Sequence, residues 1–262
     1  FSDFTYLENY TKNFNNITLV KSKINTGFAS GNMLGVNYAS GVYYFFINND
    51  CKILNDCSSI MKKYLDKNLN ISLATAKVND EYNNFSSSYK LFPSLTKELF
   101  GNSIARKFSK NKFPSNKIKL QEPTLVEVVS GSCMFFRALE FCKIGGFDTI
   151  FFLYCEEEDI SKRVWNSGKE VIFLPEAEIF HASGASTQKS FDILREYDIS
   201  YSHLVSKHFS FLVVLFLKHI RLFKHFRRSF KQKDSFRLFL FGLKGFNNKN
   251  SLRYKQKIRD DF

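Results

Sequence analysis

The chain contains little cysteine and no apolar segment long enough to cross a membrane. Its five cysteines form no Cys-x-x-Cys pair, so we expect neither a secreted disulfide scaffold nor a structural zinc site. The apolar run at residues 209–217 has nine residues, whereas a spanning helix needs about 20. Hydrophobic residues still make up 44% of the 262 residues, which excludes global disorder and permits one large domain, alone or with an appendage.

The net charge of +13 is concentrated near the C-terminus. Residues 203–262 contain 15 Lys/Arg and 3 Asp/Glu, a balance of +12, whereas residues 1–202 are nearly neutral at +1. We therefore predict a body at residues 1–202 and a basic tail at residues 203–262. An excess of charge on one segment indicates contact with a polyanionic surface, either lipid or nucleic acid.

The tail is amphipathic from Phe216 onward. Phenylalanine and isoleucine share one helical face, and the opposite face carries Lys218, Arg221, His225 and Arg228. This pattern predicts a helix that lies in the interface of an anionic membrane. A core-packing helix with a solvated basic face is the alternative interpretation. The tail's Phe and Leu content and the absence of a nucleic-acid-binding motif argue against a nucleic acid partner.

The body alternates between strand-like and helix-like segments, which predicts an α/β layered fold. Strands are expected at residues 17–20, 42–47, 71–78, 125–129, 133–137 and 171–174, the last of them closed by Pro175. Residues 42–47 are continuously apolar, as expected for a buried parallel strand. Residues 79–124 are rich in Asn, Ser and Lys and predict a long, partly helical excursion over the sheet, a kind of segment that is often functional.

Polar residues follow the strand expected at residues 42–47. In open α/β sheets ligands bind beyond the carboxyl ends of the strands, and Asn48-Asn49-Asp50 stands at that position. A carboxylate there could hold a divalent cation that bridges a diphosphate. An ordinary Asx-rich turn explains the same residues.

Four consecutive acids, residues 156–159, open a predicted helix. Acidic residues suit the positive end of a helix dipole, which is the structural explanation. Because four adjacent carboxylates repel one another, we also expect at least one to face a cleft as a general base. His181 is the only histidine of the body, and it would be a ligand only if Asp50 and the acidic run converge on it.

The order and spacing of these segments resemble family 2 glycosyltransferases. The resemblance rests on residues 25–32, the strand ending in Asp50, residues 129–137, 144–148 and 151–163, and the later positions Gly168, Pro175, His181, Gly184 and Ser186. Within the family, the chain is most similar to the rhamnosyltransferase-like enzymes of bacterial polysaccharide assembly.

The resemblance implies a glycosyltransferase A-type fold, an α/β Rossmann-like and mostly parallel sheet with helices on both faces. It implies an inverting enzyme that moves a sugar from a nucleotide-diphospho-sugar donor to a saccharide or lipid-linked acceptor, using Mg²⁺ or Mn²⁺. The subgroup suggests rhamnose from a thymidine-diphosphate donor.

Residue roles follow from the same resemblance. Asp50 and His181 would hold the metal, Glu157 would be the catalytic base, and Asp159 would be a second catalytic acid that orients the helix and loop. The positions expected to bind the donor are Asn25, Gly27, Phe28, Asn32, Asn48, Gly131 and Ser132.

Members of the family begin with a strand, a helix and a second strand that ends in an acidic segment. This sequence starts with Phe1-Ser2-Asp3, which resembles the end of that segment. We therefore expect an N-terminally truncated member, unstable or inactive on its own. The expected location is cytoplasmic, peripheral on the inner face of the plasma membrane. The alternative to an active transferase is a catalytically inactive remnant that acts as a membrane-surface binding module.

Overall fold

The computed structural model describes residues 4–80, 85–86, 88–108, 113–115, 118, 120–182 and 190–258. Residues 1–3, Gly184 and Ser186, which carry part of the sequence prediction, lie outside this description.

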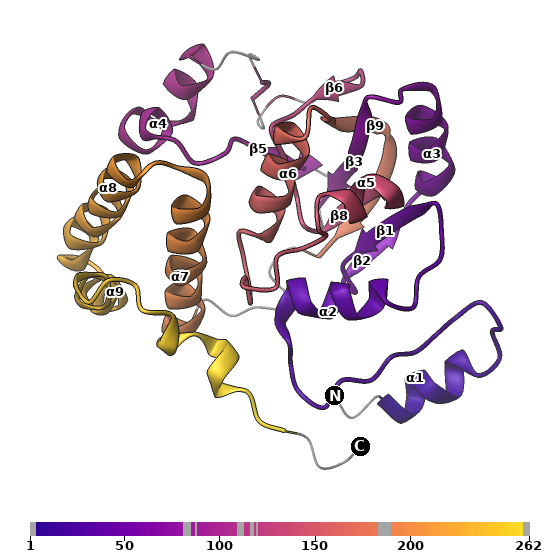
Figure 1. The fold of residues 1–262 in the computed structure, drawn as a ribbon, viewed down its shortest axis with the longest axis horizontal. Coiled ribbons are helices and arrows are strands. Elements are labelled where there is room, and N and C mark those ends of the chain that lie inside the picture. The colour runs from indigo at the N-terminus through magenta and orange to yellow at the C-terminus, as the bar shows by residue number, and fades with distance from the viewer. Residues whose placement is uncertain are drawn as a thin grey trace.

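Strands and helices alternate through the body, and helices alone make up the C-terminal part (Figure 1). The strands are β1 (Tyr43–Ile47), β2 (Cys51–Ile53), β3 (Ile71–Asn79), β4 (Phe85–Ser86), β5 (Tyr89–Lys90), β6 (Thr124–Leu125), β7 (Val128–Val129), β8 (Cys133–Arg137) and β9 (Glu170–His181). The α-helices are α1 (Phe4–Thr11), α2 (Gly27–Val36), α3 (Cys57–Lys67), α4 (Leu95–Phe108), α5 (Ala138–Lys143), α6 (Glu156–Asn166), α7 (Phe191–His208), α8 (Phe211–Ser229) and α9 (Lys233–Leu243). Two 3₁₀ helices follow, η1 (Asn248–Asn250) and η2 (Leu252–Lys255).

The main sheet has the strand order β1-β8-β3-β9-β2, with β4 beside β3 and β6 beside β9. β3 and β9 form a long parallel pair, and β1 runs in the same direction. β8 lies between β1 and β3 and is antiparallel to both, so the sheet is mixed. A strand parallel to its neighbour must be reached by a crossover connection. β8 follows the long excursion and runs in the opposite direction to β1 and β3, so it enters the sheet from the other end.

Helices cover both faces of this sheet, which confirms the predicted α/β fold class. Alternate residues of a strand point to opposite faces, so Leu73 packs into a cluster with α5 and α6, and Ala74 packs into a cluster with α3. Phe136 and Phe135 on β8 divide between the same two clusters. Both faces are therefore apolar, as the continuous apolar strands predict.

Four predicted strand details are wrong. The strand expected at residues 42–47 to be buried and parallel is β1, which among the described strands pairs with β8 alone, antiparallel, and buries only Phe46. The strand expected at residues 125–129 divides into β6, which pairs with β9, and β7, which pairs with β5.

The other two concern residues 17–20 and Pro175. No strand forms at residues 17–20, where Ile17 and Leu19 are exposed; the segment has no ladder partner among the described residues, and an unpaired strand is not stable. Pro175 does not end the last strand, because β9 continues to His181. The ladder shifts register between Ala76 and Lys77, whose partners are Leu174 and Glu178. The shift leaves Pro175, which has no N–H, outside the pairing with β3.

The basic tail is helical and packs against the body. α7 crosses the boundary expected between residues 202 and 203, and Leu204 and Val205 join a buried cluster with Phe151 of the body. In Figure 1, α7 lies between the sheet and α8. No helix among the described residues is both long enough and apolar enough to cross a bilayer.

A buried ion pair joins α7 to α8. The Asp198 carboxylate, fully buried on α7, accepts a hydrogen bond of 2.7 Å from Nε of Arg221 on α8, and Nη2 of Arg221 lies 2.6 Å from the same oxygen. His225 Nε2 lies 2.8 Å from the other carboxylate oxygen. Removing one partner of a buried pair leaves an uncompensated charge in a water-poor environment.

We predict that Asp198→Ala lowers the free energy of unfolding by about 3 kcal/mol, because it leaves the Arg221 guanidinium buried and unpaired. Asp234→Ala is the control, since Asp234 and its partner Arg237 are both exposed, at 44% and 49%, and it should cost no more than about 1 kcal/mol. Urea unfolding followed by circular dichroism measures both. Equal decreases in the free energy of unfolding would show that the α7–α8 ion pair stabilises the protein no more than an exposed ion pair does.

Candidate active site

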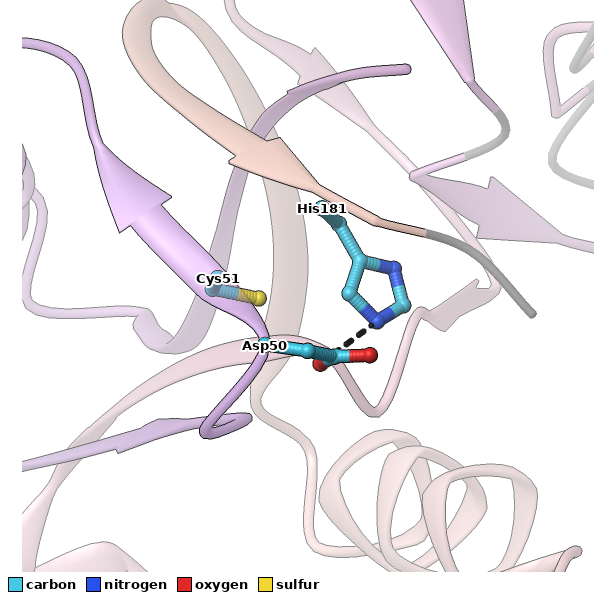
Figure 2. A group of neighbouring side chains, drawn as sticks. All are labelled: Asp50, Cys51 and His181. Atoms are coloured by element: carbon cyan, nitrogen blue, oxygen red, sulfur yellow. Dashed lines mark ion pairs between the residues drawn. The ribbon is translucent and has the colours of Figure 1, made fainter. Parts of the chain in front are cut away.

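Asp50 and His181 meet where β1 and β9 end and β2 begins. A turn after β1 closes with a hydrogen bond from Cys51 N to Asn48 O (3.1 Å), and β2 then pairs with β9 so that Cys51 lies opposite His181. This register places the imidazole over the preceding residue, and His181 Nε2 lies 3.1 Å from Oδ1 of Asp50. Asn48 Nδ2 is 3.5 Å from the same ring nitrogen. Figure 2 shows Asp50 and His181 pointing toward each other with the sulfur of Cys51 beside them.

The Asp50–His181 pair fits a divalent cation. Oδ1 of Asp50 is buried and accepts no hydrogen bond among the described residues, although His181 Nε2 is close. A buried carboxylate oxygen without a donor is costly unless a cation or water compensates it. Oxygen and imidazole nitrogen are ligands that Mn²⁺ accepts, and carboxylate oxygen suits Mg²⁺.

Cys51 completes a group of three side chains whose ligand atoms lie within 4.8 Å of one another. Burial, and next the charge of Asp50, raise the pKa of the Cys51 thiol to about 11. The sulfur is therefore a neutral thiol near pH 7, and only the thiolate is a strong metal ligand. The donor set thus favours a hard cation held by Asp50 and His181.

The turn at residues 130–132 lies between the Asp50–His181 pair and the acidic residues 156–159. Ser132 O accepts hydrogen bonds from Asn48 N (3.2 Å) and from the Cys51 thiol (3.6 Å). On its other side, a side chain added at Gly131 would have its Cβ 3.8 Å from Cδ of Glu157 and 3.8 Å from the ring of Phe28. The structure therefore brings the predicted metal, base and donor residues around one turn.

The predicted donor loop at residues 25–32 is held by backbone contacts with residue 152. Phe28 N donates to Phe152 O (2.9 Å). Gly27 has a φ of +80°, and a Cβ there would fall 2.1 Å from Phe152 O, so the loop requires glycine at this position. Asn25 accepts from Gly27 N (3.0 Å), and Asn32 donates to Phe28 O (2.9 Å). In this structure the two amides organise the loop; contact of either with a donor stays a prediction.

Glu157 lies in the first turn of α6, beside a lysine from the excursion. Lys90 Nζ on β5 is 2.9 Å from Oε1 of Glu157 and 2.5 Å from Oε1 of Glu158. Burial would raise the pKa of Glu157, but the Lys90 ammonium outweighs burial and holds that pKa below its ordinary value. The carboxylate of Glu157 is therefore ionised at neutral pH and able to accept a proton.

The neighbouring acids have different environments. Burial and then the charge of Glu157 raise the pKa of Glu158 to about 7, and burial also raises the pKa of Glu156 well above its usual range. The backbone that presents them is unusual, because Tyr154 and Cys155 both adopt positive φ, at 71° and 70°. Non-glycine residues in this region are strained, and such strain clusters at functional sites.

Asp159 is fully buried and faces the tail. Its Oδ2 accepts from Arg163 (2.7 and 2.9 Å), and its Oδ1 lies 2.8 Å from Lys207 Nζ and from His208 Nε2. Burial would raise the pKa of Asp159, but the His208 hydrogen bond and the nearby cations lower it to about 2. These contacts are those of a residue that positions α6 against α7.

Sequence reasoning missed Lys90 and Cys51. Lys90 lies within the excursion at residues 79–124, which was expected to be functional as a whole, but no spacing distinguished this lysine from its neighbours. Cys51 follows Asp50 directly, and it forms no Cys-x-x-Cys pair, the usual sequence signal for a metal ligand.

Comparison with known proteins identifies the family. Residues 5–141 match the family described as Glycosyl transferase family 2. The chain belongs to this family. The match covers more than half of the chain and includes the predicted donor loop, Asp50, Lys90 and the turn at residues 130–132.

Two bacterial proteins are similar in sequence. The N-acetylglucosaminyl-diphospho-decaprenol L-rhamnosyltransferase of Mycobacterium tuberculosis is 32% identical over 91 residues, which are 35% of this chain and 27% of that protein. The rhamnosyltransferase WbbL of Escherichia coli is 27% identical over 164 residues, 60% of each chain. The chain thus matches 27% of the length of one relative and 60% of the other, in both cases less than two thirds.

Solved structures share the fold at low sequence identity. GalNAc-T7 with UDP, GalNAc and Mn²⁺ superposes with a TM-score of 0.52 at 14% identity, covering 77% of this chain and 41% of that one. The mannosyltransferase PcManGT from Pyrobaculum calidifontis, with GDP-Man and Mn²⁺, gives 0.51 at 10% identity over 92% and 62% of the two chains. These similarities confirm the glycosyltransferase A-type fold.

We predict that Asp50→Asn and His181→Gln each weaken Mn²⁺ binding by at least about tenfold, since outer-sphere changes alone often cost that much. Cys51→Ser should leave the affinity within about twofold, because the neutral thiol is a poor ligand. Calorimetric titration of Mn²⁺ in the presence of a nucleoside diphosphate measures all three. A large loss in Cys51→Ser would make the sulfur a ligand.

We predict that Lys90→Met raises the pKa of Glu157, because the variant loses the ammonium group that most strongly opposes the effect of burial on this carboxylate. If Glu157 is the base, the acid limb of the rate–pH profile then moves to higher pH. Lys90→Arg keeps the charge and should keep the limb near its original position, and Lys63→Met controls for loss of an exposed lysine. A uniform fall in rate with an unmoved limb would limit Lys90 to a structural role.

Proposed function

We propose that this family 2 member is an inverting glycosyltransferase that moves a sugar from a nucleotide-diphospho-sugar to a hydroxyl of a saccharide or lipid-linked acceptor. The observation that carries this proposal is the placement of two chemical groups around one turn. The Asp50–His181 pair lies on one side of residues 130–132 and the ionised Glu157 on the other.

Glu157 is the proposed general base. The ammonium of Lys90 keeps Glu157 ionised. The carboxylate of Glu157 lies beside Gly131, which has no side chain to block it. Removal of the acceptor proton as the hydroxyl attacks the anomeric carbon forms the new glycosidic bond and breaks the bond to the diphosphate. The proton goes to Glu157 and the electron pair leaves with the diphosphate. One such displacement inverts the configuration and needs no protein nucleophile.

Asp50 and His181 would hold the divalent cation, with Asn48 beside the imidazole. When bound there, Mg²⁺ or Mn²⁺ would neutralise the negative charge that develops on the leaving diphosphate. Gly131 and Ser132 would border the donor sugar, since their turn separates the metal residues from the base. Gly27 and Phe28 would border the nucleotide side, because the Phe28 ring approaches the same turn.

We further propose a deoxyhexose donor such as a thymidine-diphosphate rhamnose. This rests on the two similar proteins, both of which are rhamnosyltransferases by name. The mycobacterial relative acts, by its name, on a sugar joined through a diphosphate to a polyprenol, so a lipid-diphosphate-linked acceptor is the corresponding proposal here.

Glu157→Gln should lower the transfer rate by roughly 10²–10⁴-fold, the usual contribution of a positioned general base. Nucleotide affinity should change little, because Glu157 accepts a proton and does not hold the diphosphate. Glu176→Gln is the control, since Glu176 is exposed on β9 and should leave turnover unchanged. Transfer is measured with radiolabelled donor and binding by calorimetry; equal losses of rate and affinity would contradict the role of Glu157.

The proposed function itself is tested by calorimetry with thymidine, uridine and guanosine diphosphates, with and without Mn²⁺. Metal-dependent binding of one nucleotide supports the proposal and names the donor class. Failure to bind any of them, in a preparation that unfolds cooperatively, would contradict it and favour a catalytically inactive member of the family.

A further inference from the structure

α8 turns its charged side toward the protein. Arg221 and His225 contact buried Asp198 of α7, and Lys224 lies 2.5 Å from Glu98 of α4. This placement contradicts, for Arg221 and His225, the alternative interpretation of the sequence, a core-packing helix with a solvated basic face. Carboxylates on two other helices draw the cations inward.

The apolar side of α8 consequently faces outward. Phe211, Phe216, Phe223 and Phe230 are 78%, 60%, 58% and 77% exposed. Their spacing, with that of Leu212 and Leu215, places them on one stripe of the helix. α9 packs beside α8 and also exposes Phe236, Leu240 and Leu243. Large apolar patches on a soluble surface mark interaction sites.

Cations gather at the C-terminal end of α8. Arg227, Arg228 and Lys231 line an open hollow of about 420 Å³ together with Lys224 and Gln232. Within the described part of the chain, Arg227, Arg228 and Lys231 have no carboxylate within 4.0 Å, whereas Lys224 is paired. The hollow therefore presents uncompensated positive charge at the C-terminal end of α8, where Phe230 is also exposed.

We propose that the outer face of α8 and α9 docks on an anionic lipid surface, with Phe211, Phe216, Phe223 and Phe230 entering the acyl boundary. Arg227, Arg228 and Lys231 then contact lipid phosphates. Phenylalanine on one stripe beside cationic side chains is the composition of helices that lie in a membrane interface.

Other occupants fit the surface less well. A second copy of the chain would bring two segments of balance +12 together, and like charges oppose such a pairing. A nucleic acid would satisfy the cations but would leave the apolar stripe exposed. Both remain outcomes that the experiment can register.

The docking surface begins near the proposed base. Phe209, two residues before Phe211, packs against Phe92 with ring centroids 5.8 Å apart. Phe92 follows two residues after Lys90, which binds Glu157. Docking requires lipid but neither donor nor acceptor. Vesicle binding measured without donor or acceptor therefore tests docking separately from the proposed transfer reaction.

Flotation of the full chain with vesicles tests the proposal. Vesicles containing phosphatidylglycerol in phosphatidylcholine should carry the protein upward, and pure phosphatidylcholine should carry much less. Binding should weaken as salt is raised, because the electrostatic part is screened. Competition with a duplex oligonucleotide and sizing of the free protein are run in parallel.

Phe216→Ser/Phe223→Ser should weaken vesicle binding by roughly tenfold or more, since two large apolar side chains no longer leave water. Leu69→Ser/Leu139→Ser is the matched control, because both leucines are exposed on the body, and it should bind like the unaltered chain. Arg227→Glu/Arg228→Glu/Lys231→Glu should lose about fivefold or more per residue on anionic vesicles. Lys12→Glu/Lys63→Glu/Lys67→Glu controls for net charge.

Equal binding to anionic and neutral vesicles, or equal losses in the tail and body variants, would overturn the proposal. Oligonucleotide binding that depends on Arg227, Arg228 and Lys231 without any vesicle binding would also overturn it. Self-association abolished by Phe216→Ser/Phe223→Ser, again without vesicle binding, would make the surface an interface between copies. Circular dichroism spectra and melting temperatures confirm that every variant is folded.

Discussion

The buried carboxylate of Asp159 ties the two parts of the chain together. It stands in the third position after Glu156 on α6, and it collects Arg163 from its own helix with Lys207 and His208 from the end of α7. An isolated buried charge would be very costly, whereas a carboxylate with several donors is stable. Because Glu157 lies two residues before Asp159 and α8 starts three residues after His208, this one interaction positions both the proposed base and the start of the exposed helix.

The four adjacent acids in the first turn of α6 do not destabilise the helix by mutual repulsion, because their carboxyl groups have different environments. Asp159 is neutralised by the tail, Glu157 and Glu158 share Lys90, and the pKa of buried Glu156 lies well above its usual range. Close carboxylates cannot all remain charged in a region that excludes water. The site therefore holds Glu157 ionised while Glu156 and Glu158 shift toward the protonated form, a division of roles that suits a single proton acceptor.

The turn at residues 130–132 converts separate sequence motifs into one site. Its backbone binds the Asn48 and Cys51 side of the metal pair, and its glycine leaves room beside Glu157. Rigid strands β1, β8 and β9 support the turn and the metal residues, whereas the base comes from a helix and its lysine from the excursion. Such a division lets a stable sheet carry a site assembled from distant segments.

The sequence by itself determined the α/β class, because strand-like and helix-like segments alternate along the chain, and it placed Asp50 directly after a strand. The expectations that Asp50 meets His181 and that Glu157 is the base came from the resemblance to the family. Tertiary structure alone decided the partner of Glu157, the absence of a strand at residues 17–20 and the orientation of α8. Periodicity shows that a helix has two faces but not which face turns inward. The orientation of α8 is set by Asp198 and Glu98, two carboxylates on other helices. They pair with Arg221, His225 and Lys224 on the inner side of α8, so the phenylalanines face outward.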